Sequence, residues 1–512
     1  MKYAISSESM KLSDEKTIKS GVSAIELMDR ASHALFCVAR EIGANNIAVV
    51  CGSGNNGGDG YALSLKLLDS GRQVQVYGKI PKTQSAMYYY DILMDKYSER
   101  FCPIEKMQSL ESFDLVVDCL LGIGIIGQLS AEYASYIDKI NTGKYIVSCD
   151  IPSGLNSDNG KKSPVSVIAN RTIAVQSYKT GHFLADGKDV CGNLEICDIG
   201  IEIFGKKYFI VDSKFVKNCF SIKLNNSHKG DYGRCGIVAC SENFVGAGKL
   251  AFASSTSILG ESAMRVGCGY CYLFVPQKML PYMWGEVTHS CIFSHKDLDK
   301  HKLDSIAFGM GIGDNPKLCE KVFRVQCEKI IDADAINYLA KNKDSLKKLK
   351  GCVLTPHPME FSRLTGLSVQ EILSNPIEIA EQFAKDNNLI VVLKGATSII
   401  TNGEQTYLNT SGCSGQAKGG SGDVLSGIIG SLLAQKIPAF EAAVAGCYIA
   451  GKTAEIVADK SSVYSMLPVD IATSVGNTLS SILKDKIWGY YVNKLKIEWF
   501  LQINYEIMHF LE

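Results

Sequence analysis

The chain is organised around one glycine-rich stretch, Ser414-Gly-Gln-Ala-Lys-Gly-Gly-Ser-Gly-Asp-Val-Leu-Ser-Gly427. An apolar run at helical spacing begins at Val424, so the pattern predicts a loop that opens a buried helix. The free N–H groups and the positive dipole end at such a helix start suit a phosphate or an oxyanion. Because glycine has no side chain, a ligand can approach the backbone closely. The stretch therefore predicts an anion site.

Asp423 is the unusual residue of this loop, because its carboxylate would repel a bound phosphate. One interpretation is that Asp423 takes a proton from a substrate hydroxyl. The other is that it is a first-turn acid favoured by the helix dipole. Isolated glycine-rich loops are weak signals, so the motif alone leaves both interpretations open.

Before this loop, predicted strands end on polar residues. The apolar run 389–393 delivers Lys394, whose ammonium could contact a phosphate or extend into solvent. Other strands end at Asp332 and at His357, which stands between two prolines. Alternating strands and helices indicate an α/β fold. Lys394, the anion site and Asp423 together suit phosphoryl transfer, and the P-loop pattern is absent from the sequence.

The first half opens with the same architecture. A strand over 46–51, a glycine turn over 52–60 and a helix over 61–69 predict a doubly wound α/β unit. The turn lacks the dinucleotide spacing and contains two Asn and an Asp, whose oxygens suit a cation or a polar ligand. Alternatively, Asn55 and Asn56 simply tolerate left-handed geometry in a tight turn.

Two further predicted strands end on Asp118 and Asp150. The carboxyl ends of strands in an open α/β sheet converge on the ligand crevice. A single aspartate at a strand end is more often a helix cap, but three such ends with Asp59, Asp118 and Asp150 favour a site.

Composition bounds the function classes. The 512 residues predict two or three domains, and 53 basic against 53 acidic residues provide no global field for nucleic acid or an anionic membrane. The 18 scattered cysteines predict reduced thiols in a cytosolic protein. Cys268 and Cys271 form the one Cys-x-x-Cys, without a second pair to complete a zinc site. We expect no signal peptide and no membrane span.

The first half resembles the NAD(P)H-hydrate epimerase family, through Asn55-Asn-Gly-Gly-Asp-Gly60, Asp118 with its Gly-Ile-Gly turn, and Asp150-Ile-Pro-Ser-Gly-Leu-Asn156. The resemblance implies a Rossmann-like domain over residues 1–210 that interconverts the R and S epimers of hydrated NADH or NADPH. We predict that Asp150 is the acid/base of this reaction. The resemblance also implies a potassium ion held by Asn56, Asp118 and Ser153. It implies that the substrate is held by Asn55, Asn56, Gly57, Gly58, Asp59, Gly122, Ile123, Gly124, Ile125, Ile126, Gly127, Gln128 and Asp150.

The second half resembles the ADP- or ATP-dependent NAD(P)H-hydrate dehydratases, which have ribokinase-like folds. The matching motifs are His228-Lys-Gly-Asp-Tyr-Gly233, Asp332-Ala-Asp-Ala-Ile-Asn337, Thr355-Pro-His-Pro-Met-Glu360, Val392-Leu-Lys-Gly395 and the glycine loop. The resemblance implies a domain over residues 211–486 that uses ADP or ATP, with Mg²⁺, to dehydrate the S-epimer to NADH or NADPH.

On this model Asp423 deprotonates the substrate hydroxyl. The implied nucleotide contacts are Lys394, Gly395, Ala396, Thr397, Ser398, Gly419, Gly420, Ser421 and Gly422. The implied contacts to the hydrated nicotinamide are Ala247, Gly311, His357 and Asp423. Lys418 stands where many family members have a small residue or threonine, and the sequence does not decide whether it helps the nucleotide or points to solvent. The choice between ADP and ATP also stays open.

Residues 487–512 lie beyond both resemblances and are rich in aromatic residues, so we expect a C-terminal helical extension that docks on its own chain or on a neighbouring subunit. A homo-oligomer is expected. The alternative function is a small-molecule kinase of the vitamin-kinase type whose first half is a non-catalytic binding module.

Overall fold

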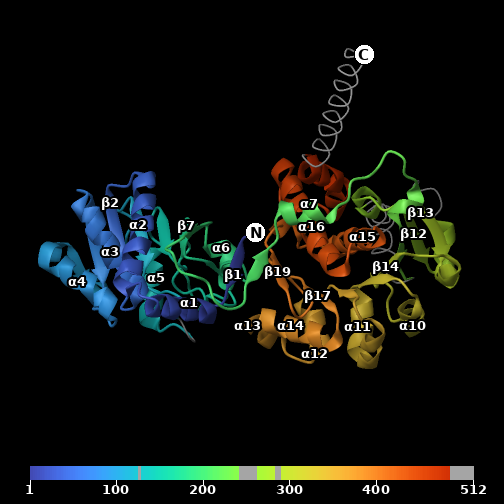
Figure 1. The fold of residues 1–512 in the computed structure, drawn as a ribbon, viewed down its shortest axis with the longest axis horizontal. Coiled ribbons are helices and arrows are strands. Elements are labelled where there is room, and N and C mark those ends of the chain that lie inside the picture. The colour runs from blue at the N-terminus through green and yellow to red at the C-terminus, as the bar shows by residue number, and fades with distance from the viewer. Residues whose placement is uncertain (125–127, 242–261, 283–289, 485–512) are drawn as a thin grey trace, which may run out of the picture. The chain divides into compact units, whose positions relative to one another are not determined.

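The computed structural model describes residues 1–124, 128–241, 262–282 and 290–484 (Figure 1). It divides into two compact units, Lys2–Phe209 and Ile210–Glu512. The expected C-terminal extension lies outside the described residues. Within the described part of the chain, no helix is both long enough and apolar enough to span a bilayer.

The N-terminal unit is built on a seven-stranded parallel sheet. The chain runs outward from β2 in one direction through β3 and β4, and from β2 in the other direction through β5 to β9. The order therefore reverses between β2 and β5, which is where an open α/β sheet forms a ligand crevice. In spatial order the strands are β4 (Phe101–Pro103), β3 (Gln73–Gly78), β2 (Asn46–Cys51), β5 (Leu115–Cys119), β6 (Ile146–Cys149), β7 (Arg171–Val175) and β9 (Asn193–Cys197).

Helices cover both faces of this sheet. Along β2, Ile47 and Val49 join one apolar cluster with α2, α3 and α4, whereas Ala48 and Val50 join another with α5. This two-residue alternation explains why a continuous apolar run can be a strand that is buried on both sides. The helices are α1 (Ser7–Lys19), α2 (Ala24–Ile42), α3 (Asn55–Asp69), α4 (Gln84–Tyr97), α5 (Ala131–Ile140) and α6 (Gly187–Val190).

The start of α3 differs from the sequence prediction. The helix begins at Asn55 rather than Tyr61, so residues 55–60 of the expected glycine turn form the first turns of the helix. Neither Asn55 nor Asn56 has a positive φ. A Cβ on Gly57 would lie 2.0 Å from the Gly52 carbonyl oxygen, and a Cβ on Gly58 would lie 2.5 Å from Met28 Cε. These glycines are therefore needed for close packing of the helix, a requirement that outweighs their poor helix propensity.

Three short strands complete the N-terminal unit. β1 (Tyr3–Ile5) pairs in parallel with β8 (Tyr178–Lys179) and antiparallel with β10 (Tyr208–Ile210). This pairing holds α1, which follows β1 directly in the chain, near the segment that contains Lys179.

The C-terminal unit contains a mixed sheet. It is parallel from β13 to β17 and ends in the antiparallel strands β18 and β19. In spatial order the strands are β13 (Ser290–Ser294), β12 (Tyr270–Val275), β11 (Arg234–Val238), β14 (Ser305–Phe308), β15 (Glu328–Ile331), β16 (Val353–Leu354), β17 (Ile390–Leu393), β18 (Ser398–Thr401) and β19 (Thr406–Asn409).

The helices of this unit form two layers around the sheet (Figure 1). Helices α15 (Ser421–Ala434) and α16 (Ala439–Lys460) pack together on one face in a large apolar core. The opposite face carries α10 (Pro316–Arg324), α11 (Ala333–Lys341), α12 (Pro358–Thr365), α13 (Val369–Ser374) and α14 (Pro376–Asn387), while α7 (Ser213–Cys219) lies beside α16. The α/β prediction is thus confirmed for both units.

Candidate active sites

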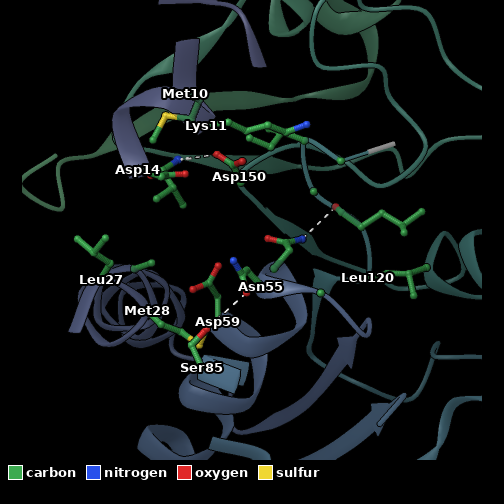
Figure 2. Close-up of a pocket in the computed structure, with 18 of the residues that line it drawn as sticks. Met10, Lys11, Asp14, Leu27, Met28, Asn55, Asp59, Ser85, Leu120 and Asp150 are labelled. Carbon is green, nitrogen blue, oxygen red and sulfur yellow. Dashed lines mark hydrogen bonds between the residues drawn. The ribbon is translucent and has the colours of Figure 1, made fainter. Parts of the chain in front are cut away.

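A cavity of about 740 Å³ opens at the switch point of the N-terminal sheet (Figure 2). Helix α1 and helix α2 supply apolar walls, including Met10, Leu27 and Met28. Of the residues predicted to hold the epimerase substrate, those that line the cavity are Asn55, Asn56, Asp59, Gly122, Ile123, Gly124, Gln128 and Asp150.

Two other described residues of that prediction, Gly57 and Gly58, do not line it. They are buried within α3, where they serve its packing, and their assignment as substrate contacts stays a prediction. Ile125, Ile126 and Gly127 lie outside the described residues.

Asp150 occupies a strained position directly after β6, with a φ of 64°. A non-glycine residue in the left-handed region is uncommon, and such residues cluster at functional sites. Its carboxylate accepts hydrogen bonds from Lys179 Nζ and, at 3.0 Å, from the Val175 N–H. It does not cap a helix, so the alternative interpretation of this strand-end aspartate is wrong.

Lys179 and His182 fix the position of Asp150 through its carboxylate and its backbone carbonyl. The Lys179 side chain is fully buried, and its ammonium pairs with the Asp150 carboxylate and donates at 2.8 Å to the Val175 carbonyl. His182 Nδ1 accepts from the Lys179 N–H at 3.1 Å, which leaves Nε2–H to donate to the Asp150 carbonyl at 2.8 Å. Burial lowers the pKa of His182 to about 4, so the ring is neutral and this tautomer is fixed.

Two more carboxylates face this cavity. Burial raises the pKa of Asp14 on α1 to about 6, an effect that Lys179 opposes. Burial, reinforced by the nearby Asp150 charge, raises the pKa of Asp59 on α3 well above its ordinary value. The Cys149 thiol contacts Asp59 Oδ2 at 3.9 Å. The cavity therefore places the buried Lys179 ammonium near three acids, Asp14, Asp59 and Asp150, and burial raises the pKa values of the first two.

The predicted potassium ligands also lie together. Asp118 is completely buried, and its carboxylate accepts from the Ser153 hydroxyl at 2.6 Å and the Ser153 N–H at 2.9 Å, among other donors. Asn56 Nδ2 donates to the Leu121 carbonyl at 2.9 Å, and the Leu121 N–H donates to Ser153 Oγ at 2.8 Å. Asn56 Oδ1 is buried, with no hydrogen-bond partner among the described residues.

This cluster is rich in oxygen. Burial raises the pKa of Asp118, although its hydrogen bonds oppose that effect. The cluster offers oxygen ligands of the kind that a monovalent cation binds: a buried carboxylate, a hydroxyl, an unpartnered amide oxygen and a backbone carbonyl. Over the described ranges, no group of three His, Cys, Asp or Glu side chains is arranged to hold a metal ion.

The second site lies at the start of α15 in the C-terminal unit. Gly420 is the N-cap with a φ of 101°, and Asp423 is the third residue of the helix. A Cβ on Gly422 would lie 3.3 Å from Asp332 Oδ2 and 3.6 Å from Lys394 Nζ. The glycine loop, Asp332 and Lys394 are thus brought together by the fold.

Lys394 lies between two acids. Its ammonium is 2.9 Å from Asp332 Oδ1 and 3.9 Å from Glu360 Oε2, and the Ser426 hydroxyl donates to Asp332 Oδ2 at 3.1 Å. Burial lowers the pKa of Lys394, but the attraction of Asp332 and Glu360 outweighs it, so the net shift is upward and the residue is a cation. Burial and the Asp332 charge raise the pKa of Asp423 to about 7, with Lys394 acting in the opposite direction. That value suits a general base at neutral pH.

The structure also gives the local positions of His357 and of the other residues predicted to bind the nucleotide or the hydrated nicotinamide. His357 caps α12: its Nδ1 accepts from the N–H groups of Met359 and Glu360, while Glu360 Oε2 accepts from the His357 N–H at 2.8 Å. The ring itself is exposed. Gly311 has a φ of 63° in the loop after β14, and Ala247 lies outside the described residues. Gly395 and Ala396 are exposed, while Thr397 is buried and Ser398 begins β18.

Lys418 neither extends freely into solvent nor points out of its loop. Its ammonium donates to the Tyr464 carbonyl at 2.7 Å and to the Met466 carbonyl at 2.6 Å. The same loop also packs on this segment at a second point, because a Cβ on Gly415 would lie 2.5 Å from Met466 Cε. Lys418 therefore ties the glycine loop to residues 464–466.

The sequence reasoning omitted several residues from the two sites. Asp332, Glu360 and Ser426 lie in quoted motifs, so those motifs were the available signal. Asp14 and Lys179 lie outside the quoted motifs, and the pairing of β1 with β8 brings both to the cavity.

Comparisons with known proteins agree with this division. Residues 24–181 match the family model described as YjeF-related protein N-terminus, and residues 235–477 match the one described as NAD(P)H-hydrate dehydratase. The bifunctional NAD(P)H-hydrate repair enzyme of Coxiella burnetii is 31% identical over 89% of this chain and 94% of its own length. The corresponding Escherichia coli enzyme is 30% identical over 91% and 92%. A solved ADP/ATP-dependent NAD(P)H-hydrate dehydratase from Bacillus subtilis shares 25% identity, with a TM-score of 0.47 over 54% of this chain and 99% of that chain.

The fold and the two matched families define a two-part enzyme in which both halves are of the α/β class. The chain belongs to the family of bifunctional NAD(P)H-hydrate repair enzymes.

Proposed function

We propose that this chain repairs hydrated NADH and NADPH. Its N-terminal unit interconverts the R and S epimers, and its C-terminal unit dehydrates the S-epimer to NADH or NADPH with ADP or ATP. The observation that carries the proposal is that one chain of this family holds two separate clusters of acids with an ammonium, Asp150 with Lys179 in one unit and Asp332 with Lys394, near Asp423, in the other. Coupling them is useful because one activity supplies the epimer that the other consumes.

Dehydration must remove the substrate hydroxyl, which is a poor leaving group unless it is first phosphorylated. Hydroxide leaves slowly at neutral pH, whereas a phosphorylated hydroxyl leaves readily. Asp423 takes the hydroxyl proton as the oxygen attacks the terminal phosphorus of the nucleotide. The N–H groups of Gly419 to Gly422 stabilise the charge that develops on the phosphoryl oxygens. Lys394 supplies a fixed cation beside them.

Magnesium fits the same centre. The Asp332 carboxylate lies beside the glycine loop, and the Glu360 carboxylate lies beside Lys394, so both could bind Mg²⁺ through oxygen. Mg²⁺ commonly binds through one or two carboxylates plus phosphates. When bound, the ion would neutralise phosphate charge. The residues assigned to the nucleotide and to the hydrated nicotinamide belong to this proposal, as does the use of either nucleotide.

In the epimerase site Asp150 is the acid/base, and Lys179 pairs with its carboxylate and orients it. A potassium ion would be held by Asn56, Asp118 and Ser153. The unpartnered Asn56 oxygen and the buried Asp118 carboxylate support this assignment. The ion would fix the loop at Leu121 that begins the cavity wall.

One assay tests the function. The protein is incubated with a mixture of hydrated NADH epimers and ADP or ATP, and the return of reduced-nicotinamide absorbance is followed. Full recovery of both epimers is expected. A vitamin-type kinase would consume nucleotide only with another acceptor, and a binding module in the first half would leave the R-epimer unchanged. The matches over both halves favour repair over the kinase alternative.

Location and assembly complete the proposal. All eighteen cysteines are free thiols, some of them exposed, which supports a reducing compartment such as the cytosol. A homo-oligomer is proposed, and sedimentation of the purified protein measures it.

A further inference from the structure

Asp59 is the acid of the epimerase cavity whose role is least explained by binding alone. It projects from α3 into the cavity, and among the described residues no Lys, Arg or His lies within ion-pair distance of it. The Cys149 thiol donates a weak hydrogen bond to its carboxylate, with a distance of 3.9 Å between Sγ and Oδ2. Asp150, by contrast, is paired with the Lys179 ammonium. Two acids of one cavity therefore have opposite electrostatic surroundings.

The two carboxyl groups come from different sides. In Figure 2, Asp59 reaches in from α3 beside Met28, whereas Asp150 enters from the strand end near α1. The space between them is bordered by the apolar side chains of Leu27 and Met28. A flat, weakly polar ring placed there would present one face to each acid.

Inversion of the substrate needs such a pair. In hydrated NADH the hydroxyl is on the ring carbon bonded to the ring nitrogen. When the nitrogen lone pair expels the hydroxyl, an acid must protonate the departing oxygen on one face. Water must then add on the other face, where a base removes its extra proton.

We propose that Asp59 is the second proton-transfer residue of the epimerase, acting on the face of the ring opposite Asp150. This inference rests on the proposed epimerase function.

The step is balanced in atoms and charge. The C–O bond breaks, its electrons stay with the oxygen, and the Asp59 proton completes a water molecule while the ring becomes an iminium ion. A water molecule on the other face forms the new C–O bond and gives one proton to the Asp150 carboxylate. The opposite epimer reacts in reverse, and proton exchange with solvent restores the starting state.

The surroundings of Asp59 agree with its role as the acid. Burial and the Asp150 charge raise its pKa well above the ordinary value, which favours the protonated form that an acid requires. The titratable groups that influence it or are influenced by it come from α1, α4 and the strands: Asp14, Tyr89, Cys51, Cys119, Cys149, Asp150, Lys179 and Cys197.

The test uses the full chain and purified R- or S-hydrated NADH. For Asp59→Asn we expect the epimerisation kcat to fall about 10²–10⁴-fold with little change in KM, and Asp59→Glu should regain part of the rate. Dehydration of the S-epimer by the same variant reports an intact C-terminal unit, and a wild-type thermal unfolding curve reports an intact N-terminal unit. Asp69→Asn, which changes an exposed acid at the end of the same helix, is the matched control and should epimerise at the wild-type rate.

A second readout follows the bond that breaks. In H₂¹⁸O, each inverted molecule should carry solvent oxygen in its hydroxyl, detected by mass spectrometry. The proposal is overturned if inversion occurs without this exchange, if Asp59→Asn keeps the wild-type kcat, or if it changes KM alone. Failure of the wild-type chain to epimerise at all would instead contradict the proposed function.

Discussion

At the scale of the residue, the proposed dehydration mechanism depends on a carboxylate whose affinity for protons is set by its neighbours. Asp423 is nearly buried beside Asp332, so its pKa is about 7 rather than near 4. If it is the base, Asp423→Ala should reduce dehydration about 10²–10⁴-fold. Epimerisation by the same variant should be unchanged, since the two centres lie in separate units. Dehydration at more than a tenth of the wild-type rate would contradict the assignment.

The pH dependence gives an independent test of the same residue. The base must be deprotonated, so the dehydration rate should rise from pH 6 to pH 8 and then level off. Asp332→Asn removes the charge that raises the Asp423 pKa, and it leaves Lys394, which lowers it. The rising limb should therefore move to lower pH. The measurement is kcat against pH at saturating nucleotide and S-epimer. If the rising part of the profile stays at the same pH in Asp332→Asn, the Asp332 charge does not set the pKa of Asp423.

At the scale of the element, glycines determine how closely α3 lies on its sheet. Gly57→Ala places a Cβ 2.0 Å from the Gly52 carbonyl oxygen, which cannot move without disturbing the backbone between β2 and α3. We expect a loss of about 1–3 kcal/mol of stability, despite the better helix propensity of alanine. Gly54→Ala is the comparison, since a Cβ there meets nothing within 4 Å. Thermal loss of epimerase activity measures both, and equal curves for the two variants would refute the packing argument.

The glycine loop depends on an element far away in the chain. Lys418 bonds two carbonyl groups of residues 464–466, so Lys418→Met should leave the loop less ordered. We expect a higher KM for ADP and a lower dehydration kcat, each by several-fold, because a hydrogen bond to a charged group contributes about 1.5–3 kcal/mol when buried and less when partly exposed. Lys460→Met, at the exposed end of α16, controls for the lost charge. Equal kinetics in the two variants would show that the tether has no role in the site.

At the scale of the whole molecule, each unit has its own apolar core and its own proposed acid/base residue. Asp150→Asn should therefore stop epimerisation and leave dehydration of pure S-epimer intact. With a mixture of epimers, the variant should convert the S portion and then slow sharply, whereas the wild type proceeds to completion. The measurement is reduced-nicotinamide absorbance over time with ADP. Completion at the wild-type rate would remove Asp150 from the acid/base role.

The sequence by itself determined the architecture and most of the chemistry. Short apolar runs that end on polar residues identified β2, β5, β15 and β17, because such runs bury both faces of a parallel strand. The motifs identified Asp150, Lys394 and Asp423, because glycine turns at strand ends need special residues in fixed order.

Only the tertiary structure decided which groups meet. Asp14 reaches the cavity because β1 pairs with β8, and Asp332 faces Gly422 because β15 lies under α15. It also decided that the Asn-Gly segment is a helix and that Lys418 is a tether, since both depend on contacts with distant backbone. The physical reason is that local pattern specifies an element, whereas pKa values and hydrogen-bond partners depend on what the packed fold places within a few ångströms.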